Sequence, residues 1–214
     1  MRTDPSMAER SVDGPVPSFS AVVLAGGRSS RMGDDKAVIR IDGQSLAERA
    51  VRTLQEAGAH EILLAWRREQ SSKFALGFAP TSGVRVVHDD GEGPLGGILL
   101  GMKESTLDLL VVLAVDLPLV RSSSIVALTR ECEATSAGVV AAFAATVGRQ
   151  PLFSVWNRRL VGDELESAWL SGQRSPSRWL AGRRDARWSP VDPEQLTNVN
   201  EPADLSRIGN LGSS

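Results

Sequence analysis

The stretch "VVLAGGRSSRMGDDK", residues 22–36, joins a run of β-forming residues to two adjacent glycines and then to three basic side chains. The apolar run as a whole, Phe19–Ala25, shows no polar alternation, which is typical of a strand covered on both faces. Gly26 and Gly27 end it. The basic side chains that follow do not stabilise a buried strand. The segment therefore predicts a strand that leads into an anion-binding loop.

Further along the chain, short apolar runs alternate with helical patterns. We expect strands at Glu61–Ala65, Val84–Val87, Leu109–Val115, Gly138–Ala144 and Pro151–Trp156. Helices are expected after Ser45, within Gly93–Met102, and over Ser122–Cys132, Arg158–Trp169 and Pro176–Leu180. Such alternation predicts right-handed crossovers and a mainly parallel sheet covered by helices. The run "LLVVLAV" is the most apolar of all and should lie at the centre of that sheet.

The first of these helices carries a clear start signal. Ser45 and Glu48 form an S-x-x-E capping box, and Gly58 suits the position just past the helix end. The apolar residues between them fall on one helical face, namely Leu46, Ala50, Val51, Leu54 and Ala57.

Length and composition narrow the class of protein. The 214 residues suffice for one domain, placed at 19–210, after an N-terminal tail at 1–18 that is poor in apolar residues. The net charge of −2 does not favour nucleic acid or an anionic membrane as a partner. A lone Cys132 excludes an intramolecular disulfide, and His60 and His88 lack metal-ligand spacing. Without a secretory h-region or a bilayer-length apolar run, the expected location is the cytoplasm.

Glycine in the loop after the first strand would let backbone N–H groups approach a phosphate, and its basic side chains would add charge. The sequence of this loop matches neither the G-x-G-x-x-G fingerprint nor the P-loop motif. It is also compatible with a glycine-rich surface turn whose arginines are solvated. The residues concerned are Gly26, Gly27, Gly33, Arg28, Arg31 and Lys36.

Asp116 follows the most apolar run directly, and Pro118 prevents the strand from continuing. In an open parallel sheet, ligands bind beyond the carboxyl ends of the strands, so this carboxylate would share an edge with the glycine loop. Mg²⁺ commonly binds through one or two carboxylates together with substrate phosphates. The alternative is that Asp116 only forms an Asx-turn.

Asp89 and Asp90 end the third expected strand and precede "GEGPLGG". They lie at the same sheet edge, although acidic loop residues are commonly just solvated. The glycines around Pro94 predict another close approach of backbone to a ligand; they are Gly93, Gly96 and Gly97.

Four segments in this order resemble the molybdenum cofactor guanylyltransferases: "LAGGRSSRMGDDK", "DDGEGPLGGILLGM", "VDLPLV" and "TNVNEPADL". The resemblance spans about residues 19 to 208. It implies a Rossmann-like three-layer α/β/α sandwich. It also implies transfer of GMP from Mg-GTP to molybdopterin-bound molybdenum cofactor, with release of pyrophosphate. Proteins that deliver or receive the cofactor would be further partners.

The resemblance assigns roles by position. The nucleotide would contact Leu24, Ala25, Gly26, Gly27 and Asp89, with Asp89 beside the guanine or the ribose. Arg31 and Lys36 would hold the phosphates, and Asp116 would bind Mg²⁺, so these three form the expected catalytic set. The acceptor would face Pro151, within the segment "RQPLF", and the two asparagines Asn198 and Asn200.

The chain departs from the family at one point, because Trp66 stands where an asparagine often follows the second strand. Trp66 either packs at the sheet edge, or the loop aligns differently by one residue. Gly26 leaves room for a purine and so favours GTP over CTP. The alternatives are a related enzyme that uses CTP or another phosphorylated acceptor, such as a molybdopterin cytidylyltransferase or a phospho-acid guanylyltransferase, and a non-catalytic nucleotide-binding module.

Overall fold

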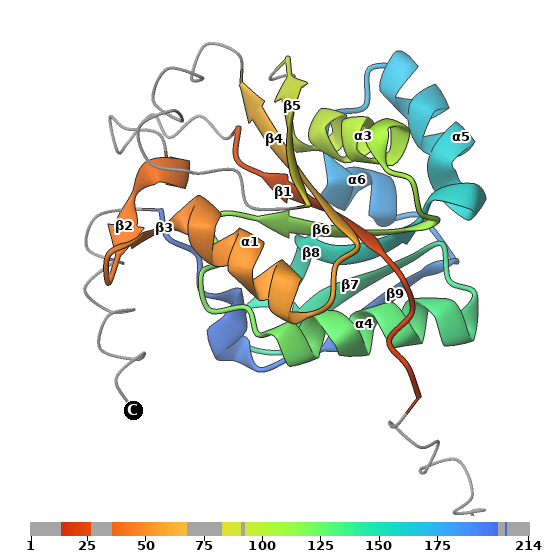
Figure 1. Ribbon diagram of the computed structural model, residues 1–214. Helices are drawn as coiled ribbons and strands as arrows, with labels where there is room; N and C mark the ends of the chain where they lie inside the picture. Colours follow the sequence, from red (N-terminus) through yellow and green to blue (C-terminus); the bar gives the residue numbers. More distant parts are fainter. Residues whose placement is uncertain (1–13, 27–35, 68–82, 91–92, 201–203, 205–214) are drawn as a thin grey trace, which may run out of the picture.

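The first apolar run forms β1 (Ser20–Leu24), a strand near the middle of a seven-stranded sheet in the computed structural model (Figure 1). In spatial order the strands are β5 (Val84–Asp89), β4 (Glu61–Arg67), β1, β6 (Leu109–Ala114), β8 (Gly148–Asn157), β7 (Val139–Ala144) and β9 (Ala186–Pro190). Four neighbouring pairs are parallel, while β8 runs antiparallel to both β6 and β7. The predicted, mainly parallel sheet is therefore confirmed.

The structure describes residues 14–26, 36–67, 83–90, 93–200 and 204. Residues 1–13 of the expected tail lie outside this part of the chain, as do four residues of the predicted anion loop: Gly27, Arg28, Arg31 and Gly33. The remaining tail residues begin at Gly14, whose carbonyl accepts a hydrogen bond from the guanidinium of Arg130.

Strand β6 occupies the centre of the sheet, as its composition predicts. All six of its residues are buried, because side chains on both faces pack beneath helices. Its parallel register with β1 places Leu24 opposite Ala114. The carboxyl ends of β1 and β6 thus lie level with each other, and the segments that follow them start from one edge of the sheet.

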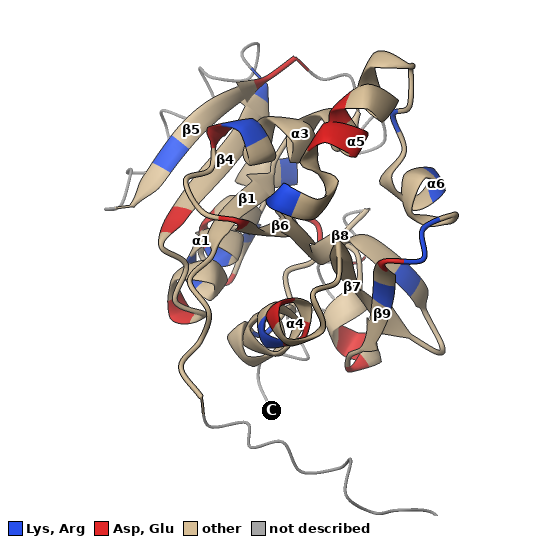
Figure 2. Ribbon diagram, turned by 90° about the vertical axis from the view of Figure 1, so that its right-hand side faces the viewer, with Lys and Arg blue, Asp and Glu red and all other residues tan. Residues whose placement is uncertain are grey.

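Helices cover both faces of the sheet (Figure 1). One layer holds α1 (Leu46–Glu56) and α4 (Ser122–Thr135), and the other holds α3 (Pro94–Glu104), α5 (Arg158–Leu170) and α6 (Pro176–Leu180). Two hydrophobic clusters lie between these layers and the sheet, so the three-layer α/β/α sandwich is confirmed. None of the helices in the described ranges combines the length and apolar character needed to span a bilayer. Acidic and basic positions are interspersed over both layers (Figure 2).

Short elements complete the chain. After the loop come η1 (Lys36–Val38) and a two-stranded hairpin, β2 (Arg40–Ile41) and β3 (Gln44–Ser45). The hairpin turns at Asp42 and Gly43, which both have positive φ, as a tight Asp-Gly turn requires. A short 3-10 helix, η3 (Pro193–Leu196), follows β9.

The capping box at the start of α1 forms as predicted. The Glu48 backbone N–H donates to Ser45 Oγ (3.1 Å), and the Ser45 N–H donates to Glu48 Oε2 (2.6 Å). Two otherwise unsatisfied donors at the helix start are thereby satisfied. Gly58, just past the helix, has φ of +87°, a conformation that favours glycine.

Two glycines of α3 allow close packing against neighbouring elements. An added Cβ at Gly97 would lie 2.7 Å from Leu24 Cδ2, and one at Gly96 would lie 2.6 Å from Trp169 Cη2. These glycines therefore let α3 pack closely against β1 and α5.

Candidate active site

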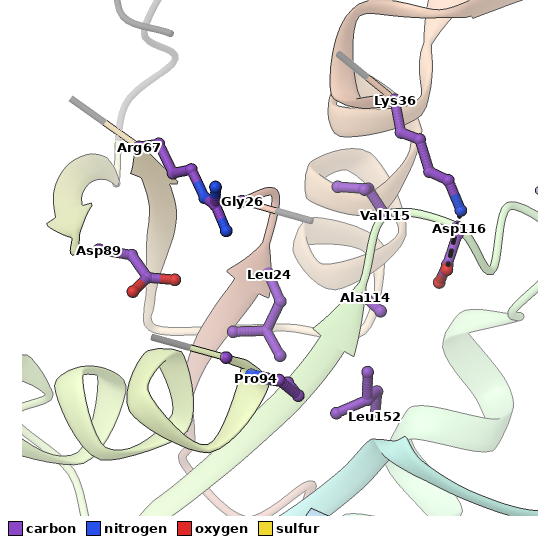
Figure 3. A pocket seen from close by; sticks show the side chains of 11 residues that line it. Leu24, Gly26, Lys36, Arg67, Asp89, Pro94, Ala114, Val115, Asp116 and Leu152 are labelled. Atoms are coloured by element: carbon purple, nitrogen blue, oxygen red, sulfur yellow. Dashed lines mark ion pairs between the residues drawn. The ribbon is translucent and has the colours of Figure 1, made fainter. Parts of the chain in front are cut away.

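A pocket of about 330 Å³ lies at the carboxyl ends of β1, β4, β5 and β6 (Figure 3). This is the edge at which ligands bind in open α/β sheets. Apolar side chains line its middle, and charged side chains lie at its two ends. The described lining residues are Leu24, Gly26, Lys36, Arg67, Asp89, Gly93, Pro94, Ala114, Val115, Asp116 and Leu152.

Lys36 and Asp116 form one charged end of the pocket, with Lys36 Nζ at 3.6 Å from Asp116 Oδ2. Asp116 is positioned by the end of β6, and Lys36 by the start of η1, where the chain returns from the loop after β1. The Asp116 side chain is only 27% exposed, and the Lys36 side chain only 15%. Two predicted catalytic residues from separate segments therefore meet at one point.

Burial raises the pKa of Asp116 above its ordinary value of 3.8, and the attraction and hydrogen bonding of Lys36 offset this only in part. Burial therefore disfavours the ionised form of this carboxylate. A divalent cation would offset that cost, and magnesium commonly takes one protein carboxylate plus substrate phosphates. Asp116 thus fits the metal role that its sequence position predicts, although no cluster of three His, Cys, Asp or Glu side chains occurs among the described residues.

The C-terminal segment contacts both residues at this end of the pocket. The Val199 N–H donates to the Asp116 carbonyl (2.9 Å), and Lys36 Nζ donates to Asn200 Oδ1 (2.8 Å). Asn200 is held in turn by its own N–H, which donates to Asp204 Oδ2 (2.9 Å). One of the two asparagines expected at the acceptor therefore contacts Lys36, a residue that was expected to hold the phosphates.

Arg67, Asp89 and Gly26 form the other end of the pocket, across an apolar middle that includes Leu24 and Pro94 (Figure 3). A Cβ added to Gly26 would lie 3.3 Å from Asp89 Oδ2 and 3.4 Å from Arg67 Cγ. Glycine is the residue that leaves this space open. Asp89 was expected from the sequence, whereas Arg67 was not.

Three residues expected to contact ligands are not among the described residues that line the pocket. Ala25 is fully buried in the core beside α1, and its N–H donates to the Ala65 carbonyl (3.0 Å). Pro151 is buried within β8, and its neighbour Leu152 reaches the pocket instead. Asn198 is half-buried next to Val199. Among the predicted site residues, the pocket is lined by Leu24, Gly26, Lys36, Asp89 and Asp116. Ala25, Pro151 and Asn198 do not line it.

Trp66 does not follow the second strand, because β4 runs two residues further than its apolar core predicts. Trp66 lies inside the strand, paired with His88, and is 1% exposed in the hydrophobic cluster on the α1 side. Successive strand residues point to opposite faces, so Arg67 faces the other way. The residue that reaches the pocket from the end of β4 is therefore Arg67, and the packing role of Trp66 is confirmed.

A doubly wound sheet with a pocket at the carboxyl ends of its strands, charged at two ends and apolar between them, is the architecture of a nucleotide-binding α/β protein. The chain belongs to the MobA-like NTP transferase domain family, whose family model matches residues 21–188.

Individual proteins are similar over most of the chain. A probable molybdenum cofactor guanylyltransferase of Opitutus terrae is 32% identical, covering 89% of this chain and 94% of its own. A molybdenum cofactor guanylyltransferase of Pseudomonas putida is 36% identical, covering 75% of this chain and 81% of its own. The crystal structure of molybdopterin-guanine dinucleotide biosynthesis protein A from Archaeoglobus fulgidus superposes with a TM-score of 0.73 at 24% identity, over 91% of this chain and 98% of that one. The family resemblance predicted from the four segments is thereby confirmed.

Proposed function

We propose that this protein transfers GMP from Mg-GTP to molybdopterin-bound molybdenum cofactor and releases pyrophosphate. The observation that carries the proposal is the pocket with Lys36 and Asp116 at one end and Arg67 and Asp89 at the other. Such a pocket can receive phosphates at the first end and a base at the second. The names of the relatives in Opitutus and Pseudomonas supply the substrates.

In this reaction the terminal phosphate of the acceptor attacks the α-phosphorus of GTP. A new P–O bond forms, the bond to the bridging oxygen breaks, and pyrophosphate leaves with the electron pair. Phosphoryl chemistry of this kind depends on positioning and charge neutralisation and needs no protein nucleophile. Lys36 would neutralise charge on the phosphates, and Asn200 orients its ammonium group. Asp116 would hold Mg²⁺ together with the phosphates, where the ion supplies further neutralisation.

The acceptor would enter over Leu152 and the Asn200 segment, because these border the Lys36 end of the pocket. Arg31 would add charge to the phosphates, and Gly27 would present backbone N–H groups to them. Pro151 would shape the acceptor site from behind its pocket-lining neighbour Leu152, and Asn198 would contribute to it from the segment that carries Asn200. The domain would span residues 19–210, with 1–18 as an appended tail.

The test combines the purified protein with Mg²⁺, molybdopterin cofactor and either GTP or CTP, and measures pyrophosphate together with nucleotide joined to the acceptor. We expect product and pyrophosphate in equal amounts with GTP and much less of both with CTP. Equal or faster reaction with CTP would identify a cytidylyltransferase instead. Nucleotide binding without turnover on any phosphorylated acceptor would identify a binding module.

A further inference from the structure

The residue that sequence reasoning missed, Arg67, occupies a defined position in the pocket. It ends β4 and pairs in register with Asp89, which ends β5. Both side chains line the pocket and lie at its end beyond Leu24, away from Lys36 and Asp116 (Figure 3). A rigid pair of strand ends therefore presents a guanidinium and a carboxylate to the same ligand.

The two groups converge on one small space. Arg67 Nε lies 3.6 Å, and Asp89 Oδ2 3.3 Å, from the point where a Cβ of Gly26 would stand. A flat ligand that slides past Gly26 would thus meet a planar set of N–H donors and a carboxylate acceptor side by side. Apolar surface from Leu24 and Pro94 borders the same space, as suits the faces of an aromatic ring.

A guanidinium next to a carboxylate is complementary to the edge of guanine. Guanine offers O6 and N7 as acceptors and, next to O6, the donors N1–H and N2–H₂. A guanidinium can donate in bidentate fashion to O6 and N7, and a carboxylate can accept from N1–H and N2–H₂ together. Cytosine would turn its N3 lone pair toward the carboxylate, which cannot donate to it. Adenine has an acceptor at N1 and the same mismatch.

We infer that Arg67 and Asp89 together select guanine, with Arg67 as the residue that reads O6 and N7 and Asp89 as the residue that reads N1–H and N2–H₂. The inference rests on the proposed function, because it takes the nucleotide to lie with its phosphates at Lys36. It makes Arg67 a specificity-determining residue of the nucleotide site.

The experiment measures equilibrium binding of GTP, XTP, ITP and CTP, each with Mg²⁺, to the full chain and to variants. Xanthine carries a carbonyl at C2 in place of the amino group. In Asp89→Asn, the side-chain carbonyl still accepts from N1–H, and its amino group donates to O2 of xanthine. We expect the XTP-to-GTP affinity ratio to rise roughly 100-fold, because one good contact is gained and another lost. The matched control is Asp90→Asn, the exposed neighbour at the same strand end, which should leave the ratio unchanged.

For Arg67→Gln we expect GTP, ITP and XTP, which all carry O6, to bind roughly 10-fold more weakly while CTP is unaffected. Arg85→Gln, on the exposed face of β5, is the control. Should Arg67→Gln lose its cooperative thermal melting, Arg67→Lys replaces it, since lysine keeps the charge and loses the planar fork.

Two results would overturn the inference while leaving the proposed function intact. An equal loss for all four nucleotides in Asp89→Asn would mean that the carboxylate binds the ribose. An equal loss for CTP and GTP in Arg67→Gln would place Arg67 on the phosphates. If the unmodified protein binds none of the four nucleotides, the proposed function fails as well.

Discussion

At the scale of single residues, Asp116 combines two demands that oppose each other. The metal role proposed for Asp116 requires an ionised carboxylate, whereas burial near the end of β6 favours the neutral form and raises its pKa. Burial is the main cause of this shift, and Lys36 is the charge that opposes it.

The substitution Asp116→Asn separates catalysis from stability. We expect turnover to fall roughly 100-fold or more, because an amide oxygen is a poorer ligand for a hard cation. In the absence of nucleotide, the melting temperature at pH 7 should equal or slightly exceed that of the parent protein. Guanylyl transfer at saturating Mg²⁺ and thermal melting are the paired measurements, with the exposed Asp163→Asn on α5 as control.

The sign of the pH dependence follows from the raised pKa. The folded state holds the Asp116 proton more tightly than the unfolded state, so stability falls as pH rises from about 4 through the folded-state pKa. The gain from Asp116→Asn should therefore be present at neutral pH and disappear below the ordinary value of 3.8. A variant that melts well below the parent protein at pH 7 would show that the Lys36 ion pair outweighs burial.

Lys36→Ala should slow turnover more than it weakens GTP binding. The ammonium group is held by Asp116 and Asn200 before any substrate arrives, so its charge is already positioned for the transferring phosphate. We expect kcat to fall roughly 100-fold, with a much smaller change in the dissociation constant for GTP. Lys103→Ala on α3 is the control. Equal losses in the two quantities would mean that Lys36 binds ground and transition states alike.

How far single residues could be predicted depended on whether they end an apolar run. Asp89 and Asp116 do so, and both line the pocket. Arg67 does not, because the sequence does not reveal that β4 continues through Trp66 or which of the two residues faces the core. The contact between Lys36 and Asn200 joins residues that are 164 positions apart in the sequence, and no local pattern encodes it. Placement of Gly27 and Arg31 stays a prediction.

At the scale of elements, α1 shows how much a single capping box contributes to the stability of the fold. Its capping box satisfies donors at the helix start, and loss of such a cap typically costs about 1 kcal/mol. Ser45→Ala should therefore lower the melting temperature by roughly 2–4 °C in a protein of this size.

The matched control for the cap is Ser123→Ala. Ser123 is exposed in the first turn of α4, where the structure has no side-chain cap hydrogen bond. Thermal melting of the two variants should show a clear drop for Ser45→Ala and almost none for Ser123→Ala. Similar drops in both would mean that the serine acts through helix propensity rather than through the cap.

Elements with continuous apolar sequence were predictable, whereas the edge strand β9 and the start of β8 were not. Strand β9 reads "ARWSP", with an arginine and a terminal proline and no fully buried residue. Only its pairing with β7 makes it a strand, and that pairing is long-range. Strand β8 likewise begins at Gly148, three residues before its apolar part, because β7 extends alongside it past an irregularity at Ala141 and Ala142.

At the scale of the whole molecule, residues 197–200 near the C-terminal end contact the Lys36 and Asp116 end of the pocket. Val199 is fully buried, and its N–H holds the carbonyl of Asp116. A chain ending at Leu196 keeps every strand of the sheet but lacks these contacts. We expect it to bind GTP while losing most of its turnover and some stability, since burying a valine contributes about 1.5–3 kcal/mol.

The control for this truncation is a chain ending at Asp204, which keeps the hydrogen bond from Asn200. Nucleotide binding, turnover and melting are measured on both chains. Full turnover in the shorter chain would show that Lys36 needs no support from the C-terminal segment.

The strand order also constrains how the chain can fold as it leaves the ribosome. Strand β7 is synthesised before both of its neighbours, β8 and β9, and β8 must enter between β6 and β7. The four strands β5, β4, β1 and β6 can assemble in the meantime, with β6 as a temporary edge. Until Asn157 has emerged, that open edge and the apolar β7 remain without their final partner. The nascent chain thus passes through an interval in which two strands are open to mispairing, and a chaperone that covers strand edges would act there.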